Sequence, residues 1–465
     1  MLTAISRYGA RVLPDTQQLI KQCARRGDLV QGPEIPEFEE AFSQRLQGRK
    51  ALTTSYGRMA FYYLLKALDL PPASEVIFPA LTFWVVPEMA RGLGLRPVFV
   101  DVDPDSFNLD PDTLERAVTG DTRVIVPTHL YGLPCDMDRI LDVADRHHLF
   151  VIEDCAHSLG ALYRGRPVGT FGDAAFFSFQ TLKPLNTYGG GMAVVRDPAL
   201  ARKVAALVRA EPWPSESEVR KKLLVGRIQR ILVRPSVFRW TLFPVLWAAS
   251  FLGARPDVYL WEAIRPLDPL PRGYRQRYSN VQAALGLEGL RHLPRWIAAA
   301  CGNAEILSAA ISLLPAVRPP IVPPDRTHVF YQYCLRVPDR DRLVRACIRR
   351  GLDIETLHVD VCPQLPLFQP FAAPCPGAAR AAQAVQLPAY PLFRKIRLGG
   401  YPIPSPPRCG TLSPRPRLSL SLRATEMASQ SPGACRRRSC CSRGECHTTT
   451  ITNAESGGCS RSASC

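Results

Sequence analysis

The chain has 465 residues, of which 46% are hydrophobic, a length and composition that suit a large α/β domain with a smaller one. The formal net charge is +17, but residues 401–465 hold nine arginines and three glutamates and so account for +6 of it. The remaining basic residues lack the basic and aromatic pattern of nucleic-acid recognition, so we expect no nucleic-acid partner.

The first residues and the cysteines indicate the cellular compartment and whether a metal site is expected. The N-terminus lacks an apolar segment followed by a small-residue cleavage site, so we expect no secretory signal. The cysteines show neither CxxC pairs nor a matching histidine pattern, so we expect no metal site. A reducing, cytoplasmic location follows as the prediction.

Strand-like runs alternate with helical stretches through the first 200 residues, which predicts a mostly parallel sheet wrapped by helices. In such sheets, ligands bind beyond the carboxyl ends of the strands, so the candidate chemistry should lie there. The predicted strands fall within residues 74–83, 96–103, 122–132, 149–157, 174–179 and 190–195.

The alternation stops at a basic and apolar stretch from about residue 214 to 272, which we interpret as an insertion in a large domain of residues 1–272. A spanning helix is not expected there, because residues 240–254 lack charge but are too few to cross a bilayer. Residues 221–256 suit either a segment packed on its own enzyme, which we favour, or a peripheral contact with an anionic membrane.

Regular patterning resumes at Gly273, and residues 273–400 are predicted to form a long helix and a small C-terminal domain. Residues 331–359 have strand, helix and strand character. Residues 401–465 are rich in Pro, Ser, Arg and Cys and are predicted to be a disordered tail. The abrupt change of composition also suits the product of a frameshift.

Lys183 is the first candidate catalytic residue. Its amine can form a Schiff base with an aldehyde cofactor such as pyridoxal phosphate (PLP), provided that the amine is deprotonated. Asp154 ends a predicted strand 29 residues earlier and can keep a pyridine nitrogen protonated. Each residue alone is more often a solvated or capping side chain, and it is their order and spacing that favours a site.

Other residues suit the remaining parts of such a cofactor. Gly57 follows small polar residues and opens a predicted helix, whose backbone amides can face a phosphate. The hydroxyl of Ser178 can add a contact to the same phosphate, and Phe83 offers a flat face for a ring.

The motifs S-x-G, PALTF, VDVDP, HLYG, IEDCAHSLGA, GTFGDAAFFSFQTLK, GGG and QAALGL occur in an order that resembles the DegT/DnrJ/EryC1/StrS aminotransferase family, from about Pro33 to Tyr390. The resemblance implies the type I PLP-enzyme fold, with a mostly parallel sheet in the large domain and a smaller α+β domain. It also implies a homodimer with shared active sites and transfer of an amino group from L-glutamate to a nucleotide-linked keto-sugar.

The resemblance also assigns roles by position. Lys183 matches the Schiff-base lysine and Asp154 the partner of the pyridinium nitrogen. Cofactor-binding positions fall on His157, Ser178, Gly57, Arg58, Phe83 and Arg275, and a position near the sugar pocket falls on His328.

Two departures from the family pattern leave alternatives open. Arg58 and Arg275 stand where relatives usually have Thr and Asn, although arginine also binds phosphate. One alternative is therefore a catalytically weak PLP-binding or regulatory protein of the same fold. A second alternative, which follows from a membrane contact of residues 221–256, is an aminotransferase that acts on a lipid-linked sugar at the membrane surface.

Overall fold

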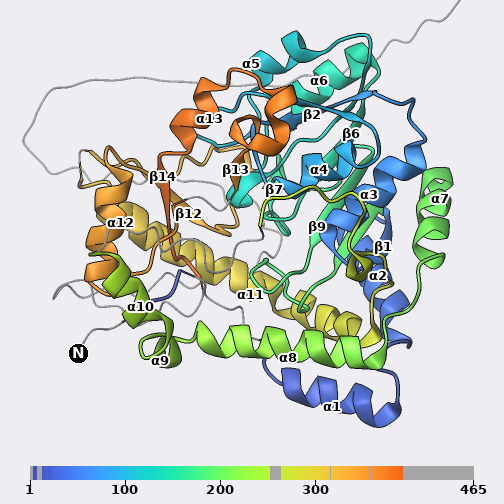
Figure 1. Ribbon diagram of the computed structural model, residues 1–465, viewed down its shortest axis with the longest axis horizontal. Helices are drawn as coiled ribbons and strands as arrows, with labels where there is room; N and C mark the ends of the chain where they lie inside the picture. The colour runs from blue at the N-terminus through green and yellow to red at the C-terminus, as the bar shows by residue number, and fades with distance from the viewer. Residues whose placement is uncertain (1–3, 8–12, 252–262, 315, 357–358, 391–465) are drawn as a thin grey trace, which may run out of the picture. The chain divides into compact units, whose positions relative to one another are not determined.

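The computed structural model describes residues 4–7, 13–251, 263–314, 316–356 and 359–390, all within one compact unit. Figure 1 shows a central sheet flanked by helices. The proposed tail of residues 401–465 lies outside the described residues. None of the helices in the described ranges is long and apolar enough to cross a membrane.

The central sheet has seven strands in the order β1-β10-β9-β6-β5-β2-β4. Neighbours from β9 to β4 pair in parallel, whereas β10 runs antiparallel to both β9 and β1. Each predicted strand is therefore present, and the mostly parallel sheet is confirmed. The strands are β1 (Lys50–Thr54), β2 (Glu75–Pro79), β4 (Arg96–Val100), β5 (Thr122–Ile125), β6 (Phe150–Asp154), β9 (Ala174–Ser178) and β10 (Gly191–Val195).

Burial explains why these segments are strands. Strand β2, which pairs in parallel, and strand β10, which runs antiparallel to its neighbours, are both buried at every position, as strands covered on both faces of a sheet are. Short strands complete other sheets, with β3 (Leu81–Thr82) paired to β13 (Asp360–Val361), and β7 (Leu162–Tyr163) between β8 (Arg166–Pro167) and β11 (Arg326–Thr327).

Helices from both halves of the sequence cover the sheet. Helix α3 packs on β9 and β10, so its N-terminus lies at the carboxyl end of β9. The α-helices up to Arg209 are α1 (Thr16–Arg26), α2 (Glu34–Arg45), α3 (Gly57–Leu68), α4 (Val85–Arg91), α5 (Pro111–Leu114), α6 (Met137–His147) and α7 (Pro198–Arg209).

The stretch that we interpreted as an insertion forms three helices in its described part. They are α8 (Glu216–Leu232), α9 (Pro235–Phe238) and α10 (Leu242–Ala249). Helix α8 begins at a capping box, in which Ser215 and Glu218 satisfy each other's backbone N–H groups. In Figure 1 the three helices follow one another along one border.

The region after residue 272 contains the predicted long helix as a single element, α11 (Asn280–Ile311). It is followed by β12 (Tyr333–Arg336), α12 (Arg340–Arg349), α13 (Pro376–Ala381) and β14 (Ala384–Leu387), with β12 paired to β14. The prediction of a strand directly after α12 is wrong. Residues 352–356 instead make single bridges, from Leu352 to Ile5 and from Glu355 to Gln386. The domain boundary at 272/273 stays a prediction.

Candidate active site

The fold gathers the candidate residues at one edge of the central sheet. Asp154 ends β6, Ser178 ends β9, and Gly57 opens the helix that follows β1. Because β6 and β9 run in parallel, their carboxyl ends lie side by side. The connection from Ser178 to β10 carries Lys183 and folds back on itself, since Phe179 donates to Gly190 and accepts from Thr187.

Lys183 and His157 are in direct contact. The Nζ atom of Lys183 lies 2.8 Å from Nε2 of His157. Asp154 is buried, its carboxylate accepts a hydrogen bond from the backbone of Ala156, and its charge interacts with that of Lys183. Three of the residues predicted from the sequence thus form one cluster.

The surroundings shift the pKa of Lys183 toward the neutral amine, to about 8. Burial lowers the pKa of Lys183, and the guanidinium of Arg58 lowers it further, although the Asp154 carboxylate acts in the opposite direction. Burial raises the pKa of Asp154. The backbone N–H of Tyr131 donates to Nδ1 of His157, so the proton of a neutral imidazole lies on Nε2. That N–H can donate to Nζ of Lys183 only when the amine is unprotonated.

A narrow turn forms where β10 passes the start of α3. A Cβ atom added at Gly57 would lie 2.8 Å from Cβ of Ser178 and 2.9 Å from the carbonyl oxygen of Phe177. One added at Gly191 would lie 2.4 Å from the nitrogen of Gly57. Only glycine allows this approach, which sets the first amides of α3 beside the hydroxyl-bearing Ser178.

Arg58 is buried in a group of aromatic rings. Its guanidinium carbon lies 5.0 Å from the ring centre of Tyr274, 5.6 Å from that of Phe83 and 5.7 Å from that of Tyr56. It also donates a hydrogen bond to the hydroxyl of Tyr274. The charge is therefore held beside the candidate stacking residue Phe83 and near Lys183.

Two predicted residues lie apart from this cluster. Arg275 is mostly exposed and pairs with Glu211 at 3.0 Å. His328 is buried, its Nδ1 accepts from the backbone of Phe330, and its ring stacks on that of Phe330 at 4.0 Å. Burial lowers the pKa of His328 to about 3, so its imidazole stays neutral near pH 7.

The structure adds residues that the sequence did not single out. Tyr331 lies against the cluster, with its ring 5.4 Å from Nζ of Lys183 and 4.4 Å from the ring of His157. The ring of Tyr131 stacks on the other side of His157, and the buried carboxylate of Glu355 interacts with Lys183. Tyr331 lies three residues after His328, in the same motif, and was not singled out from the sequence; the sugar-pocket role of His328 stays a prediction.

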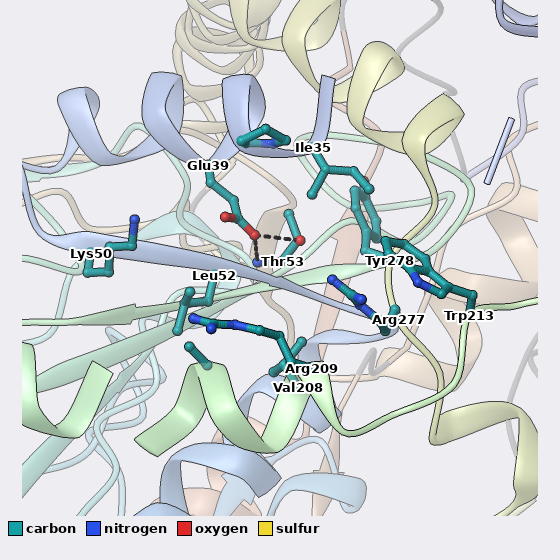
Figure 2. Close-up of a pocket in the computed structure, with 12 residues that line it drawn as sticks. Ile35, Glu39, Lys50, Leu52, Thr53, Val208, Arg209, Trp213, Arg277 and Tyr278 are labelled. Carbon is teal, nitrogen blue, oxygen red and sulfur yellow. Dashed lines mark hydrogen bonds between the residues drawn. The ribbon is translucent and has the colours of Figure 1, made fainter. Parts of the chain in front are cut away.

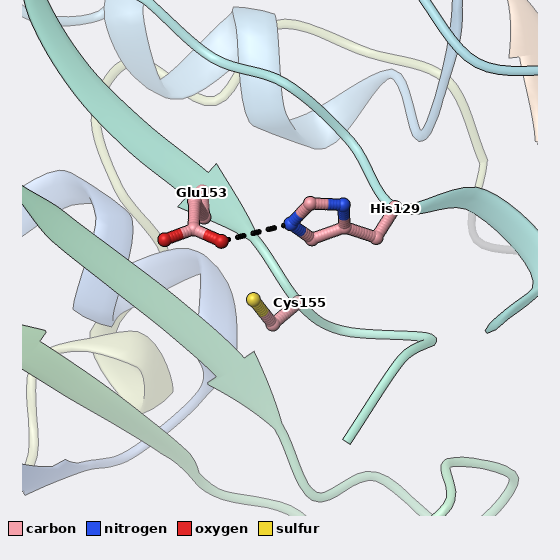
Figure 3. A group of neighbouring side chains, drawn as sticks. All are labelled: His129, Glu153 and Cys155. Carbon is pink, nitrogen blue, oxygen red and sulfur yellow. Dashed lines mark hydrogen bonds and ion pairs between the residues drawn. The ribbon is translucent and has the colours of Figure 1, made fainter. Parts of the chain in front are cut away.

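A buried triad lies beside Asp154, at the end of β6. Figure 3 shows His129, Glu153 and Cys155 with their side chains converging. His129 bonds Glu153 at 3.0 Å, and the Glu153 carboxylate also accepts from the backbone of Gly169, Phe171 and Gly172. Burial raises the pKa of Cys155 to about 12, which disfavours the thiolate that a metal would need. We therefore interpret the triad as structural.

A cavity of about 260 Å³ lies behind β1, against α2 and α7. Figure 2 shows Glu39 inside it, where its Oε1 accepts from the backbone and hydroxyl of Thr53 at 2.8 and 2.7 Å. Lys50, Arg209 and Arg277 make its other charged lining, and Lys183 is not part of it. The cavity therefore lies beside β1, the strand that leads to Gly57, and Lys183 does not line it.

Comparison with known proteins gives matches along most of the chain. A family model described as the DegT/DnrJ/EryC1/StrS aminotransferase family matches residues 12–225 and 249–397. The GDP-perosamine synthase of Caulobacter vibrioides is 32% identical over 359 residues, which cover 76% of this chain and 81% of that protein. A pleiotropic regulatory protein of Geobacillus stearothermophilus is 29% identical over 400 residues, covering 84% and 93%.

Solved structures agree with this result. DesV of S. venezuelae, solved with a ketimine intermediate, superposes with a TM-score of 0.65 at 28% identity, covering 81% of this chain and 89% of that one. DesI, solved with its TDP-sugar product, superposes with a TM-score of 0.66 at 25% identity, covering 84% and 89%. The α/β fold expected from the sequence is therefore confirmed.

Proposed function

Because the chain belongs to the DegT/DnrJ/EryC1/StrS aminotransferase family, we propose that it transfers an amino group from L-glutamate to a nucleotide-linked keto-sugar, with PLP held as a Schiff base by Lys183. The observation that carries this proposal is the contact between Lys183 and His157 beside the buried Asp154 carboxylate. An amine, an imidazole and a carboxylate in one buried cluster are the groups that bind and activate this cofactor.

The residues present fit PLP. Asp154 would lie beside the pyridine nitrogen, where a cationic ring favours the carboxylate that burial alone disfavours. Ser178 and the first amides of α3 would take the phosphate, and Arg58 would add a positive charge near it. When bound, the cofactor supplies an electron sink for the substrate carbon that loses its proton.

Lys183 is suited to move that proton. Its amine must be neutral to accept a proton, and burial together with the charge of Arg58 shifts its pKa in that direction. His157 holds Nζ in place from one side, and the Tyr331 ring limits its movement on the other. Both neighbours therefore lie where they can orient the amine.

The substrates are proposed from the relatives. GDP-perosamine synthase and dTDP-3-amino-3,4,6-trideoxy-alpha-D-glucose transaminase carry nucleotide-sugar names, and we infer the same substrate class here. We also propose a homodimer with shared active sites. The exposed position of Arg275, away from its own Lys183, is compatible with a role at the partner's site.

The lysine assignment is tested by reduction with borohydride. We expect wild-type protein incubated with PLP to keep the cofactor covalently after reduction, with the label on the peptide that contains Lys183. Lys183→Ala should abolish the label, whereas the exposed-lysine control Lys203→Ala should retain it. An unchanged level of labelling in Lys183→Ala would contradict the assignment.

The catalytically weak alternative rests on Arg58, which fills the space between Phe83 and Tyr274. Addition of L-glutamate to the PLP-loaded protein separates the two functions, because only a transaminase converts its cofactor to the amine form, pyridoxamine phosphate, on that addition. A panel of 3-keto and 4-keto nucleotide sugars should then identify the acceptor. An inert cofactor would favour the alternative.

A further inference from the structure

The segment from residue 219 to 251 has an unusual charge pattern. It contains seven lysines and arginines and no acidic residue. The match to the family stops at residue 225 and resumes at 249, so most of this segment is an addition to the shared fold. Its properties therefore call for an explanation other than the common reaction.

Helix α8 has one face in the core and one in solvent. Val219, Leu223 and Gly226 are buried at helical spacing, and Gly226 packs directly on the ring of Tyr188. The opposite face exposes large apolar side chains, with Leu224 56% and Ile228 47% exposed. Because the buried face of α8 is packed in the core, poor packing of the helix does not explain why these apolar side chains are exposed.

The same face of α8 also carries positive charge. Lys221 and Arg227 are exposed in the same two helical turns as Leu224, Val225 and Ile228. A mixture of apolar and basic side chains on one helical face is typical of helices that lie in a membrane interface.

The following helices repeat this arrangement. Phe243 and Leu246 anchor α10 in the core that also contains α11 and α12 residues. Trp240 and Val245, by contrast, are 70% and 68% exposed, and the guanidinium of Arg239 lies 4.6 Å from the Trp240 ring. Tryptophan beside arginine suits the headgroup region of a bilayer, where one end of the side chain is apolar and the other wet.

We propose that this surface, the α8–α10 face, binds a membrane that contains anionic lipids. The face consists of exposed residues of one continuous acid-free segment: Lys221, Leu224, Val225, Arg227, Ile228, Trp240, Val245 and Trp247. Its cations would meet lipid phosphates and carboxylates, while its apolar side chains enter the boundary between headgroups and acyl chains. The proposal does not depend on which sugar the enzyme aminates.

Charge argues against a second copy of the chain as the occupant. A twofold contact places the same surface of each copy against the other. On this face such a contact would bring two acid-free, basic segments together and would be opposed by their repulsion. An anionic lipid surface instead complements the charge.

Vesicle co-sedimentation of the full-length, PLP-loaded protein tests the proposal. We expect binding to phosphatidylserine-containing phosphatidylcholine vesicles, little binding to pure phosphatidylcholine, and weaker binding as salt rises. Absence of binding to the anionic vesicles at low salt would overturn it, as would equal binding to both kinds of vesicle.

Paired variants locate the contact. Lys221→Glu/Arg227→Glu should weaken binding by about 30-fold or more, because each cation near an anionic surface strengthens binding by roughly fivefold. The charge control Arg116→Glu/Arg202→Glu changes the net charge equally at exposed residues outside the face and should bind more tightly than this variant. If both variants lose the same affinity, the effect is one of net charge and the proposal fails.

Apolar variants test the two parts of the face separately. Leu224→Gln/Ile228→Gln and Trp240→Ser/Val245→Ser should each weaken binding by roughly tenfold. The control Leu313→Ser/Ile321→Ser removes exposed apolar side chains elsewhere and should bind as the wild type does. Full binding by both face variants would assign the contact to another part of the chain, such as the arginine-rich residues 401–465. A change of oligomeric state on sedimentation, without vesicle binding by the wild type, would identify a second copy as the occupant.

Discussion

At the residue scale, Gly57 connects backbone geometry to cofactor binding. Gly57→Ala would place a methyl group against the backbone carbonyl of Phe177, which cannot rotate away. We expect the start of α3 to move and the affinity for PLP to fall by at least about tenfold, as a loss of roughly 1.4 kcal/mol would give. Fluorescence titration with PLP measures this effect.

A glycine in open space is the matched control. Gly302 lies within α11, and an added Cβ would meet nothing within 4 Å. Gly302→Ala should leave PLP affinity unchanged and slightly raise the melting temperature, since alanine favours helix. Equal affinities for Gly57→Ala and the wild type would show that this turn does not hold the phosphate.

Asp360 predicts a pH dependence of stability. Burial raises its pKa to about 6, and its Oδ2 has no hydrogen-bond partner among the described residues. The folded state therefore binds a proton more tightly than the unfolded chain, so stability is lost as the pH rises from about 4 to 6 and stays lost above. Asp360→Asn should stabilise the protein by up to about 3 kcal/mol at pH 7.5 and little at pH 4.

Thermal unfolding at the two pH values measures the difference. The exposed Asp121→Asn serves as the control, with a small effect at both. A stabilisation by Asp360→Asn that is the same at pH 4 and pH 7.5 would refute the role assigned to its ionisation.

The site residues that the sequence did not predict are single residues rather than whole motifs. Asp154, His157 and Lys183 could be predicted together, because residues at adjacent strand ends meet whenever the strands pair in parallel. Tyr331 could not, because its position depends on the segment around residue 331 packing against Gly132. No local pattern encodes such a contact between distant segments.

At the element scale, the Glu39 side chain of α2 bonds β1 directly. Glu39→Ala would leave the buried backbone N–H of Thr53 without its acceptor, at a cost of about 1–3 kcal/mol. Because Thr53 leads directly to the start of α3, PLP affinity should fall as well. Thermal unfolding and PLP titration report the two effects.

The variants around Glu39 distinguish its hydrogen bonds from general helix effects. Glu39→Gln keeps an acceptor oxygen and should recover part of the stability. Glu40→Ala removes only an exposed contact with Gln44 and should change stability by less than about 0.5 kcal/mol. A loss in Glu40→Ala as large as that in Glu39→Ala would contradict the assignment.

Elements with a strong pattern were predictable, and those built from distant partners were not. The runs of β-forming residues became the strands of the main sheet because each is covered on both faces. The segment from Leu352 to Glu355 looked like a strand as well. Leu352 bridges to Ile5 and Glu355 bridges to Gln386, so the segment does not form a continuous ladder with either partner.

At the scale of the whole molecule, a buried ion pair ties the first residues to the last part of the fold. Arg7 bonds Asp353 through Nε at 2.8 Å, and both side chains are almost fully buried. Arg7→Ala should lower the free energy of unfolding by about 3–5 kcal/mol, because it removes one partner of a buried ion pair. Denaturant unfolding measures the loss.

The exposed Arg26 provides the comparison. Arg26 pairs with Asp28 and Glu34 but is half exposed, so Arg26→Ala should cost less than about 1 kcal/mol. Equal losses for the two variants would show that the pair between Arg7 and Asp353 is not specially important to the fold.

The contact of Arg7 with Asp353 also has a consequence for synthesis on the ribosome. The two residues are 346 positions apart, and translation at about 5–20 residues per second separates their appearance by roughly 20–70 s. The hydroxyl of Tyr390, which bonds the carbonyl of Ser6, appears later still. During this interval the first residues lack the neighbours that bury them, so a nascent chain should expose its N-terminus to proteases and chaperones until translation is nearly complete.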